Sequence, residues 1–167
     1  MFRSVMFIIL FGQAATVYAA SHCTASEVDY FSCKIKGSSK VVSLCGSELY
    51  DPDSATRKVD AWLQYRFGHL GRPELVYPSE KPDSLRAFTG EHVAPYSESV
   101  DTIWFKRGTA TYGIEVRDAK NKFYGVWVGI DDKNTEFSCD GQPDKWGTLE
   151  GNKFFGLVIQ LQSNPRE

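Results

Sequence analysis

Histidine is scarce in this sequence, and the motifs of common catalytic and cofactor sites are missing. The three histidines, His22, His69 and His92, stand in unrelated segments. The chain has no G-x-S-x-G, H-E-x-x-H, phosphate-loop or glycine-rich dinucleotide motif. Two carboxylates would suffice for glycoside hydrolysis, and Glu74, Glu115 and Asp118 are available, but charged residues are mostly solvated. We therefore expect a protein that is not an enzyme and needs no cofactor.

The chain also lacks a charge excess and a long apolar run. Its 19 basic and 21 acidic residues give a net charge of −2, which argues against a general nucleic-acid or anionic-membrane binder. The apolar stretch 5–11 is too short to span a membrane. It follows Arg3 and precedes Val-Tyr-Ala at 17–19, which resembles a small-x-small cleavage signal. We expect residues 1–20 to be a cleaved Sec-type signal peptide and residues 21–167 to form one periplasmic or secreted domain.

Four cysteines, Cys23, Cys33, Cys45 and Cys139, lie in the expected mature chain. An even number of cysteines in an exported protein predicts two disulfides. A zinc site is the alternative, but no C-x-x-C spacing is present and histidines are few. The disulfide interpretation is therefore favoured over a metal site, and the sequence leaves all three possible connectivities open.

Strand-like alternation recurs between turn-forming segments. The expected strands are 29–35, 40–45, 61–68, 73–78, 102–106, 109–117, 122–130, 135–139 and 154–161, with a short one at 85–88 inside a long 79–99 connection. Prolines at both ends predict an edge position for 73–78, and apolar residues on both faces predict a doubly covered strand at 122–130. No helix longer than two turns is expected. The pattern predicts a single all-β domain, an antiparallel β-sandwich or barrel.

The segment 101–117 contains the residues that are most typical of a binding surface. Gly108 can adopt the positive φ of a hairpin turn between two strands, and around it stand Lys106, Arg107, Thr109, Thr111 and Tyr112. One interpretation is an exposed turn whose Tyr112 faces the core in alternation with its neighbours. The other is a protruding loop in which these five residues bind acidic groups of a partner, since Arg binds carboxylates in a bidentate manner and hydroxyls donate to them.

Tryptophan offers a second candidate surface. Trp62, Trp104, Trp127 and Trp146 could form a sugar-stacking face, which Gln64 and Arg66 beside Trp62 could extend. Packing against a sheet face is the alternative for each indole. Coplanar exposure would favour the sugar-stacking interpretation.

Several short segments resemble a group of small exported proteins of Gram-negative bacteria, mostly described as uncharacterised. They are Tyr-Phe-Ser-Cys at 30–33, Val-Ser-Leu-Cys at 42–45, Leu-Gln-Tyr-Arg-Phe-Gly at 63–68, Pro-Glu-Leu-Val-Tyr-Pro at 73–78 and Gly-Thr-Ala-Thr-Tyr at 108–112. More loosely, the chain is similar to periplasmic lysozyme inhibitors, which are small disulfide-bonded β proteins. These insert a Ser-Gly-x-x-Tyr loop into the lysozyme cleft. Here Arg107 stands in place of Ser, and one more residue precedes Tyr112.

The resemblance implies an exported binding protein that places the 106–112 hairpin in a carboxylate-lined cleft of a lysozyme-type glycosidase. Two alternatives remain open. A carbohydrate- or peptidoglycan-binding module would bind an envelope glycan through exposed tryptophans. A structural envelope protein would carry a large apolar surface patch.

Overall fold

The computed structural model of this 167-residue chain describes residues 20–50, 56–94, 96, 98–141 and 152–162. The expected signal peptide lies, except for its last residue, outside the described residues. The elements are β1 (Val28–Lys34), β2 (Lys40–Gly46), β3 (Leu63–His69), β4 (Arg72–Tyr77), the 3₁₀ helix η1 (Ser84–Ala87), β5 (Thr89–Val93), β6 (Ser99–Arg107), β7 (Ala110–Asp118), β8 (Phe123–Ile130), β9 (Lys133–Ser138) and α1 (Asn152–Gln162).

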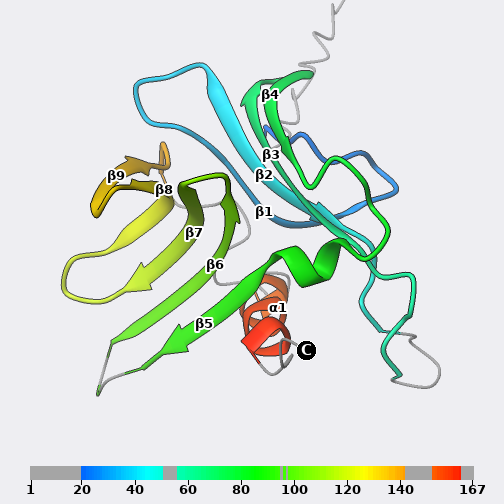
Figure 1. Ribbon diagram of the computed structural model, residues 1–167. Helices are drawn as coiled ribbons and strands as arrows, with labels where there is room; N and C mark the ends of the chain where they lie inside the picture. Colours follow the sequence, from blue (N-terminus) through cyan, green and yellow to red (C-terminus); the bar gives the residue numbers. More distant parts are fainter. Residues whose placement is uncertain (1–19, 51–55, 95, 97, 142–151, 163–167) are drawn as a thin grey trace, which may run out of the picture.

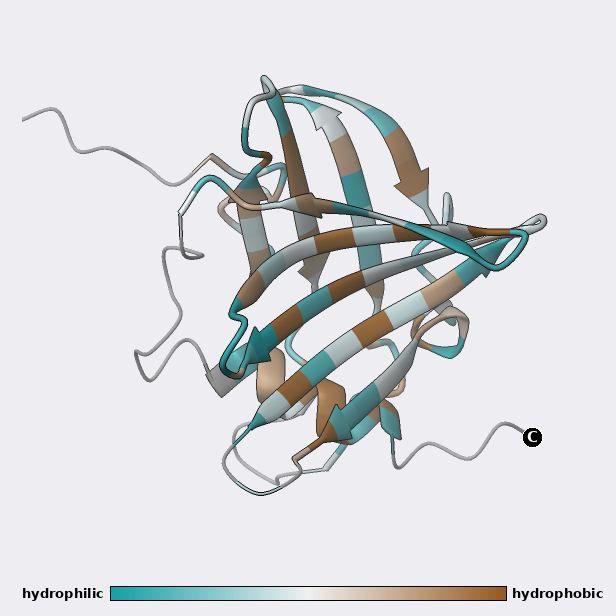
Figure 2. Cartoon of the chain, turned by 90° about the vertical axis from the view of Figure 1, so that its left-hand side faces the viewer, coloured by the Kyte–Doolittle hydropathy of each residue, from teal (hydrophilic) through white to brown (hydrophobic). Residues whose placement is uncertain are grey.

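Two antiparallel sheets face each other (Figure 1). One has the strand order β1-β2-β3-β4 and the other β5-β6-β7-β8-β9. Hydrophobic and hydrophilic residues alternate along the strands, as Figure 2 shows, because successive side chains point to opposite faces of a sheet. The predicted all-β sandwich is confirmed, and so is the edge position of β4. In the described part of the chain, no helix is long and apolar enough to cross a membrane.

Phe105 lies at the centre of the contact between the sheets. Its ring stacks on Tyr112 of β7, at 5.1 Å between centroids, and on Tyr77 of β4, at 4.4 Å. Tyr65 of β3 packs against the same ring at 5.1 Å. Each such aromatic pair adds about 1 kcal/mol to the gain from burial. This group therefore joins strands of both sheets through one fully enclosed side chain, since Phe105 is only 2% exposed.

The first and last strands join the two sheets along one side. A disulfide connects Cys33 of β1 to Cys139, which directly follows β9. Beside it, Ile35 forms a bridge with Cys139, and the amide of Lys36 donates to the carbonyl of Ser138 at 2.9 Å. The second disulfide, Cys23–Cys45, attaches the N-terminal segment to β2. Both predicted disulfides are thereby confirmed, and their connectivity is defined.

The strand predicted at 154–161 is wrong, because this segment belongs to helix α1. The buried residues are Phe154, Leu157, Val158 and Leu161. Their spacing of three and four residues is that of one helical face, whereas the predicted alternation would have buried Phe155 and Ile159, which are exposed. Gly90 allows α1 to pack closely on β5, because a Cβ at this position would overlap the carbonyl of Val158.

The short strand predicted at 85–88 is also wrong, since Ser84–Ala87 form the 3₁₀ helix η1. Leu85 and Phe88 are both buried, and residues three apart share one face of a 3₁₀ helix. The hydroxyl of Ser84 accepts a hydrogen bond from the amide of Leu63, which fixes η1 against β3. The long connection expected at 79–99 also contains β5, whose alternation was not recognised in the sequence.

The two disulfides differ in the length of chain that each one closes, and this difference predicts their contributions to stability. Cys33–Cys139 spans 106 residues and Cys23–Cys45 spans 22. Loop-closure entropy then gives about 5 and about 3 kcal/mol respectively. We expect Cys33→Ser/Cys139→Ser to lower the free energy of unfolding more than Cys23→Ser/Cys45→Ser does, as measured by urea denaturation. The opposite order would contradict the role assigned to the β1–β9 connection.

Candidate functional site

The predicted hairpin is present, and its turn is exposed. β6 and β7 pair in register up to Arg107 and Ala110, so that Gly108 and Thr109 form the turn. Gly108 has a φ of 61°, a backbone conformation that favours glycine. The side chains of Lys106, Arg107 and Thr109 are exposed. The end of this hairpin therefore presents two cations and a hydroxyl to solvent.

The five predicted site residues do not form one surface. Tyr112 points into the sandwich and stacks on Phe105, as its alternation with Ala110 and Ile114 indicated. Lys106 and Thr111 are paired across β6 and β7 and point to the opposite side of the sheet. We call that side, turned away from the four-stranded sheet, the outer face. Arg107 is the last residue of β6, and Thr109 belongs to the turn.

Two tryptophans lie in one cross-strand row on the outer face. Trp104 of β6 is opposite Gly113 of β7, and Gly113 is opposite Trp127 of β8. Because neighbouring strands lie about 4.8 Å apart, the two tryptophan backbones are separated by roughly 10 Å. We call these three residues the tryptophan row. β8 was expected to be covered on both faces, but its outward-facing Trp127 instead lines an open depression.

Gly113 gives the Trp127 indole its position. A Cβ added at this glycine would overlap three atoms of that ring system, Cε2, Nε1 and Cζ2. The indole therefore lies directly against the backbone of the neighbouring strand. A glycine covered by a cross-strand aromatic ring is a known way to stabilise a sheet. Gly125 and Gly129 lie two residues before and after Trp127 on β8, so the same face of this strand has no side chain on either side of the indole.

The tryptophan row lies in a shallow depression of about 500 Å³ on the outer face. Besides the two indoles, its lining consists of three carboxylates, two cations and three smaller polar side chains: Glu91, Glu115, Glu136, Lys106, Arg117, Thr102, Thr111 and Asn134. The site thus combines the flat apolar surface of two indoles with many hydrogen-bonding groups.

Arg117 holds two of these carboxylates in place. Its Nε donates to Glu115 at 2.8 Å, and its guanidinium also contacts Glu136 at 3.4 Å. Burial disfavours the charge of Arg117, but the hydrogen bonds and charges of the two glutamates outweigh burial and raise its pKa above the ordinary value. No ion pair between described residues includes Lys106 or Glu91, although both side chains line the depression.

The other tryptophans lie elsewhere. Trp62 precedes β3 in the four-stranded sheet, and the ammonium of Lys81 covers its ring at 4.0 Å from the centroid. Gln64 is buried, with its amide donating to the carbonyl of Pro78 at 2.8 Å. The predicted extension of a sugar-stacking face around Trp62 is therefore absent among the described residues. Trp146 lies outside them.

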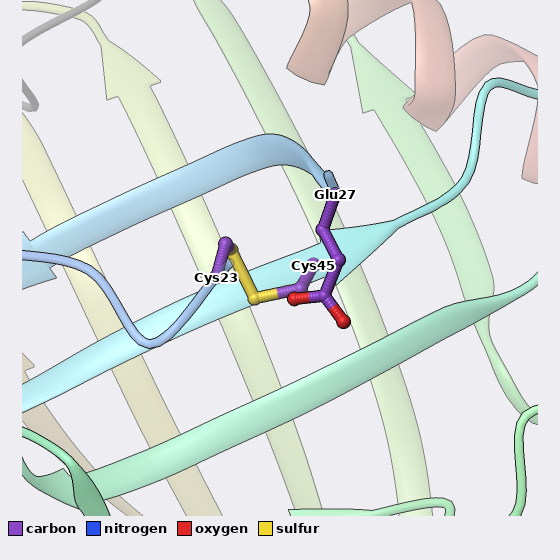
Figure 3. Close-up of side chains that lie close together, drawn as sticks. All are labelled: Cys23, Glu27 and Cys45. Atoms are coloured by element: carbon purple, nitrogen blue, oxygen red, sulfur yellow. A yellow bond between two sulfur atoms is a disulfide. The ribbon is translucent and has the colours of Figure 1, made fainter. Parts of the chain in front are cut away.

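A second cluster, on the four-stranded sheet, brings together Cys23, Glu27 and Cys45 (Figure 3). Such residue types can bind a metal ion, but a cysteine ligand must be a thiolate, and both sulfurs here form a disulfide. The Glu27 carboxylate accepts two hydrogen bonds from Arg66, at 2.7 and 2.8 Å. Its role is to fasten the N-terminal segment to β3.

The ion pair between Glu27 and Arg66 changes the pKa of the carboxyl. Hydrogen bonding from Arg66 lowers the pKa of Glu27 from 4.5 to about 2, although burial opposes the change. Lys81 contributes a further contact at 3.2 Å. The side chain of Glu27 is only 6% exposed, so water screens the pair weakly.

A third titratable pair lies beneath α1. The Asp101 carboxylate accepts a hydrogen bond from Nδ1 of His92 at 2.7 Å, and the His92 ring meets the edge of Phe155. Burial raises the pKa of Asp101, while the His92 hydrogen bond opposes this. The pair joins β5 to β6 on the inner face, and its contact with Phe155 makes it part of the packing of α1.

Comparison of the chain with protein-family models, curated proteins and solved structures found no match.

The lowered pKa of Glu27 predicts how stability depends on pH. A carboxyl with a lowered folded-state pKa stabilises the fold above its ordinary value of 4.5 and loses this effect as the pH falls through about 2. We expect Glu27→Gln to reduce the free energy of unfolding by about 3 kcal/mol at pH 7 and about 1 kcal/mol at pH 2.5.

Urea denaturation at the two pH values measures this difference, and Glu80→Gln, at an exposed position, is the matched control. A loss from Glu27→Gln that stays constant between pH 7 and pH 2.5 would contradict the assigned ion pair.

Proposed function

We propose that this chain is an exported, non-catalytic binding protein that binds a saccharide on the outer face of its five-stranded sheet. The observation that carries the proposal is the tryptophan row, in which Trp104 and Trp127 flank Gly113 within one depression. Two disulfides are compatible with an oxidising extracellular or periplasmic location.

A sugar ring has an apolar C–H face and a rim of hydroxyl groups. An indole offers a large, rigid apolar surface with one polar N–H, so it can cover the C–H face and leave the hydroxyls accessible. Trp127 is held against Gly113 before any ligand arrives. Little side-chain entropy is then lost on binding, which favours affinity.

The surroundings of the tryptophan row supply partners for hydroxyl groups. Glu91 and Glu115 can accept hydrogen bonds from sugar hydroxyls, and Asn134 can both donate and accept. These groups stand on β5, β7 and β9, around the row rather than within it. An apolar centre surrounded by polar groups fits the amphipathic shape of a saccharide.

Removing either indole of the tryptophan row tests the proposal. We expect Trp104→Ala and Trp127→Ala each to weaken binding of a tetrasaccharide such as chitotetraose at least tenfold, because each removes a stacking surface. Isothermal titration calorimetry measures the dissociation constant, and thermal unfolding checks that the fold persists.

Trp62→Ala is the matched control, since that indole lies on the other sheet beneath Lys81. Equal weakening by all three variants, or none by the two outer-face variants, would contradict the proposed site.

The exposed hairpin turn supports a second candidate, inhibition of a lysozyme-type glycosidase. Arg107 and Thr109 extend from the end of β6 and β7, and an arginine can bind a catalytic carboxylate in a bidentate manner. Tyr112 is not part of this surface, because it stacks on Phe105 between the sheets. Insertion would therefore depend on Lys106, Arg107 and Thr109.

We expect Arg107→Ala to raise the concentration needed for half-inhibition of a susceptible lysozyme at least tenfold while leaving the melting temperature unchanged. Peptidoglycan lysis by c-, g- and i-type lysozymes measures the effect. Tyr112→Phe, which keeps the stacked ring, is the control and should inhibit like the native chain. Absence of inhibition of all three types at micromolar protein would remove this candidate.

A further inference from the structure

The outer face has a charge asymmetry along its strands. Lys106 lies two residues from Trp104 toward the hairpin turn, and Arg107 adds a second cation at the same end. Successive outward-facing residues of a strand are about 7 Å apart, so the Lys106 ammonium lies within reach of a ring stacked on Trp104. The side of the tryptophan row that is nearer to the hairpin turn is therefore cationic.

The opposite side of the tryptophan row is acidic. Glu91, Thr102 and Glu115 lie there in one cross-strand row. Glu115 is engaged by Arg117, and Glu91 takes part in no ion pair between described residues. Carboxylates accept hydrogen bonds from hydroxyl groups, which every saccharide carries. This side can therefore orient a sugar but does not distinguish a neutral sugar from an acidic one.

Lys106 is the group in the depression that can make this distinction. It has no ion pair between described residues, whereas Arg117, the other cation of the lining, is paired with Glu115 and Glu136. A sugar carboxylate placed there would gain a charge-assisted hydrogen bond, and Thr111, directly opposite Lys106 on β7, offers a hydroxyl to the same group. A hydroxyl of a neutral sugar can accept a hydrogen bond from the ammonium but forms no ion pair with it.

We propose that the depression selects an acidic saccharide, whose ring stacks on the tryptophan row and whose carboxylate binds Lys106 while its hydroxyls donate to Glu91. This inference rests on the proposed function of the same face and adds the chemical class and the orientation of the ligand. Because Lys106 is exposed, the preference should be strongest at low ionic strength and decrease as salt screens the charge.

The test compares two ligands that share the same sugar rings, tetragalacturonic acid, which carries carboxylate charges, and its fully methyl-esterified form, which carries none. Calorimetry at about 20 mM salt should give at least fivefold tighter binding of the acid to the native chain. In Lys106→Gln the ratio of the two affinities should fall close to one. Lys120→Gln, an exposed lysine in the β7–β8 turn, is the matched control and should keep the native ratio.

The outcomes separate the two proposals. Equal binding of the acid and the ester, or a preference that persists in Lys106→Gln, would overturn the assignment of an acidic ligand while saccharide binding still stands. Tighter binding of a glucosamine tetramer, which is cationic, would overturn it as well and would point to Glu91 as the selecting group. If chitotetraose, the acid and the ester all fail to bind, the proposed function fails together with this inference.

Discussion

The stacking of Phe105 between Tyr77 and Tyr112 is the contact on which the arrangement of the binding face depends. It turns Phe105 inward on β6 and Tyr112 inward on β7. Since side chains alternate, Trp104 and Gly113 must then point outward together. A shift of one residue in the pairing of β6 and β7 would exchange the two faces. The core contact therefore defines the tryptophan row as well as the inter-sheet packing.

The two sheets differ in what covers the face that each turns away from the other. On the four-stranded sheet the N-terminal segment is fastened by Cys23–Cys45 and by the Glu27–Arg66 pair, so that the polar residues Ser43 and Gln64 are buried. On the five-stranded sheet, glycines leave space beside indoles, and charged groups surround an open depression. The face of the four-stranded sheet is therefore covered by contacts within the protein. The outer face of the five-stranded sheet presents stacking surfaces and hydrogen-bonding groups to solvent, and for this reason the proposed ligand is assigned to it.

Alternation in the sequence was sufficient to predict most strands and the hairpin at Gly108, but it left two interpretations of Tyr112 open, of which the inward one is observed. It failed for α1, because the apolar residues of 154–161 satisfy both a two-residue and a helical period, and only packing on β5 chooses between them. The tryptophan row was beyond sequence analysis for another reason. It depends on the register of three strands, and the sequence of one strand does not specify which residue of its neighbour lies opposite.

The most direct test of saccharide binding on the outer face is the response of the tryptophan indole N–H signals in the NMR spectrum during titration with an oligosaccharide. We expect the signals of Trp104 and Trp127 to shift together in a saturable manner, while that of Trp62 stays in place. A shift of Trp62 without the other two, or no saturable shift of Trp104 and Trp127 with neutral or acidic oligosaccharides, would contradict the assignment of this face as the binding site.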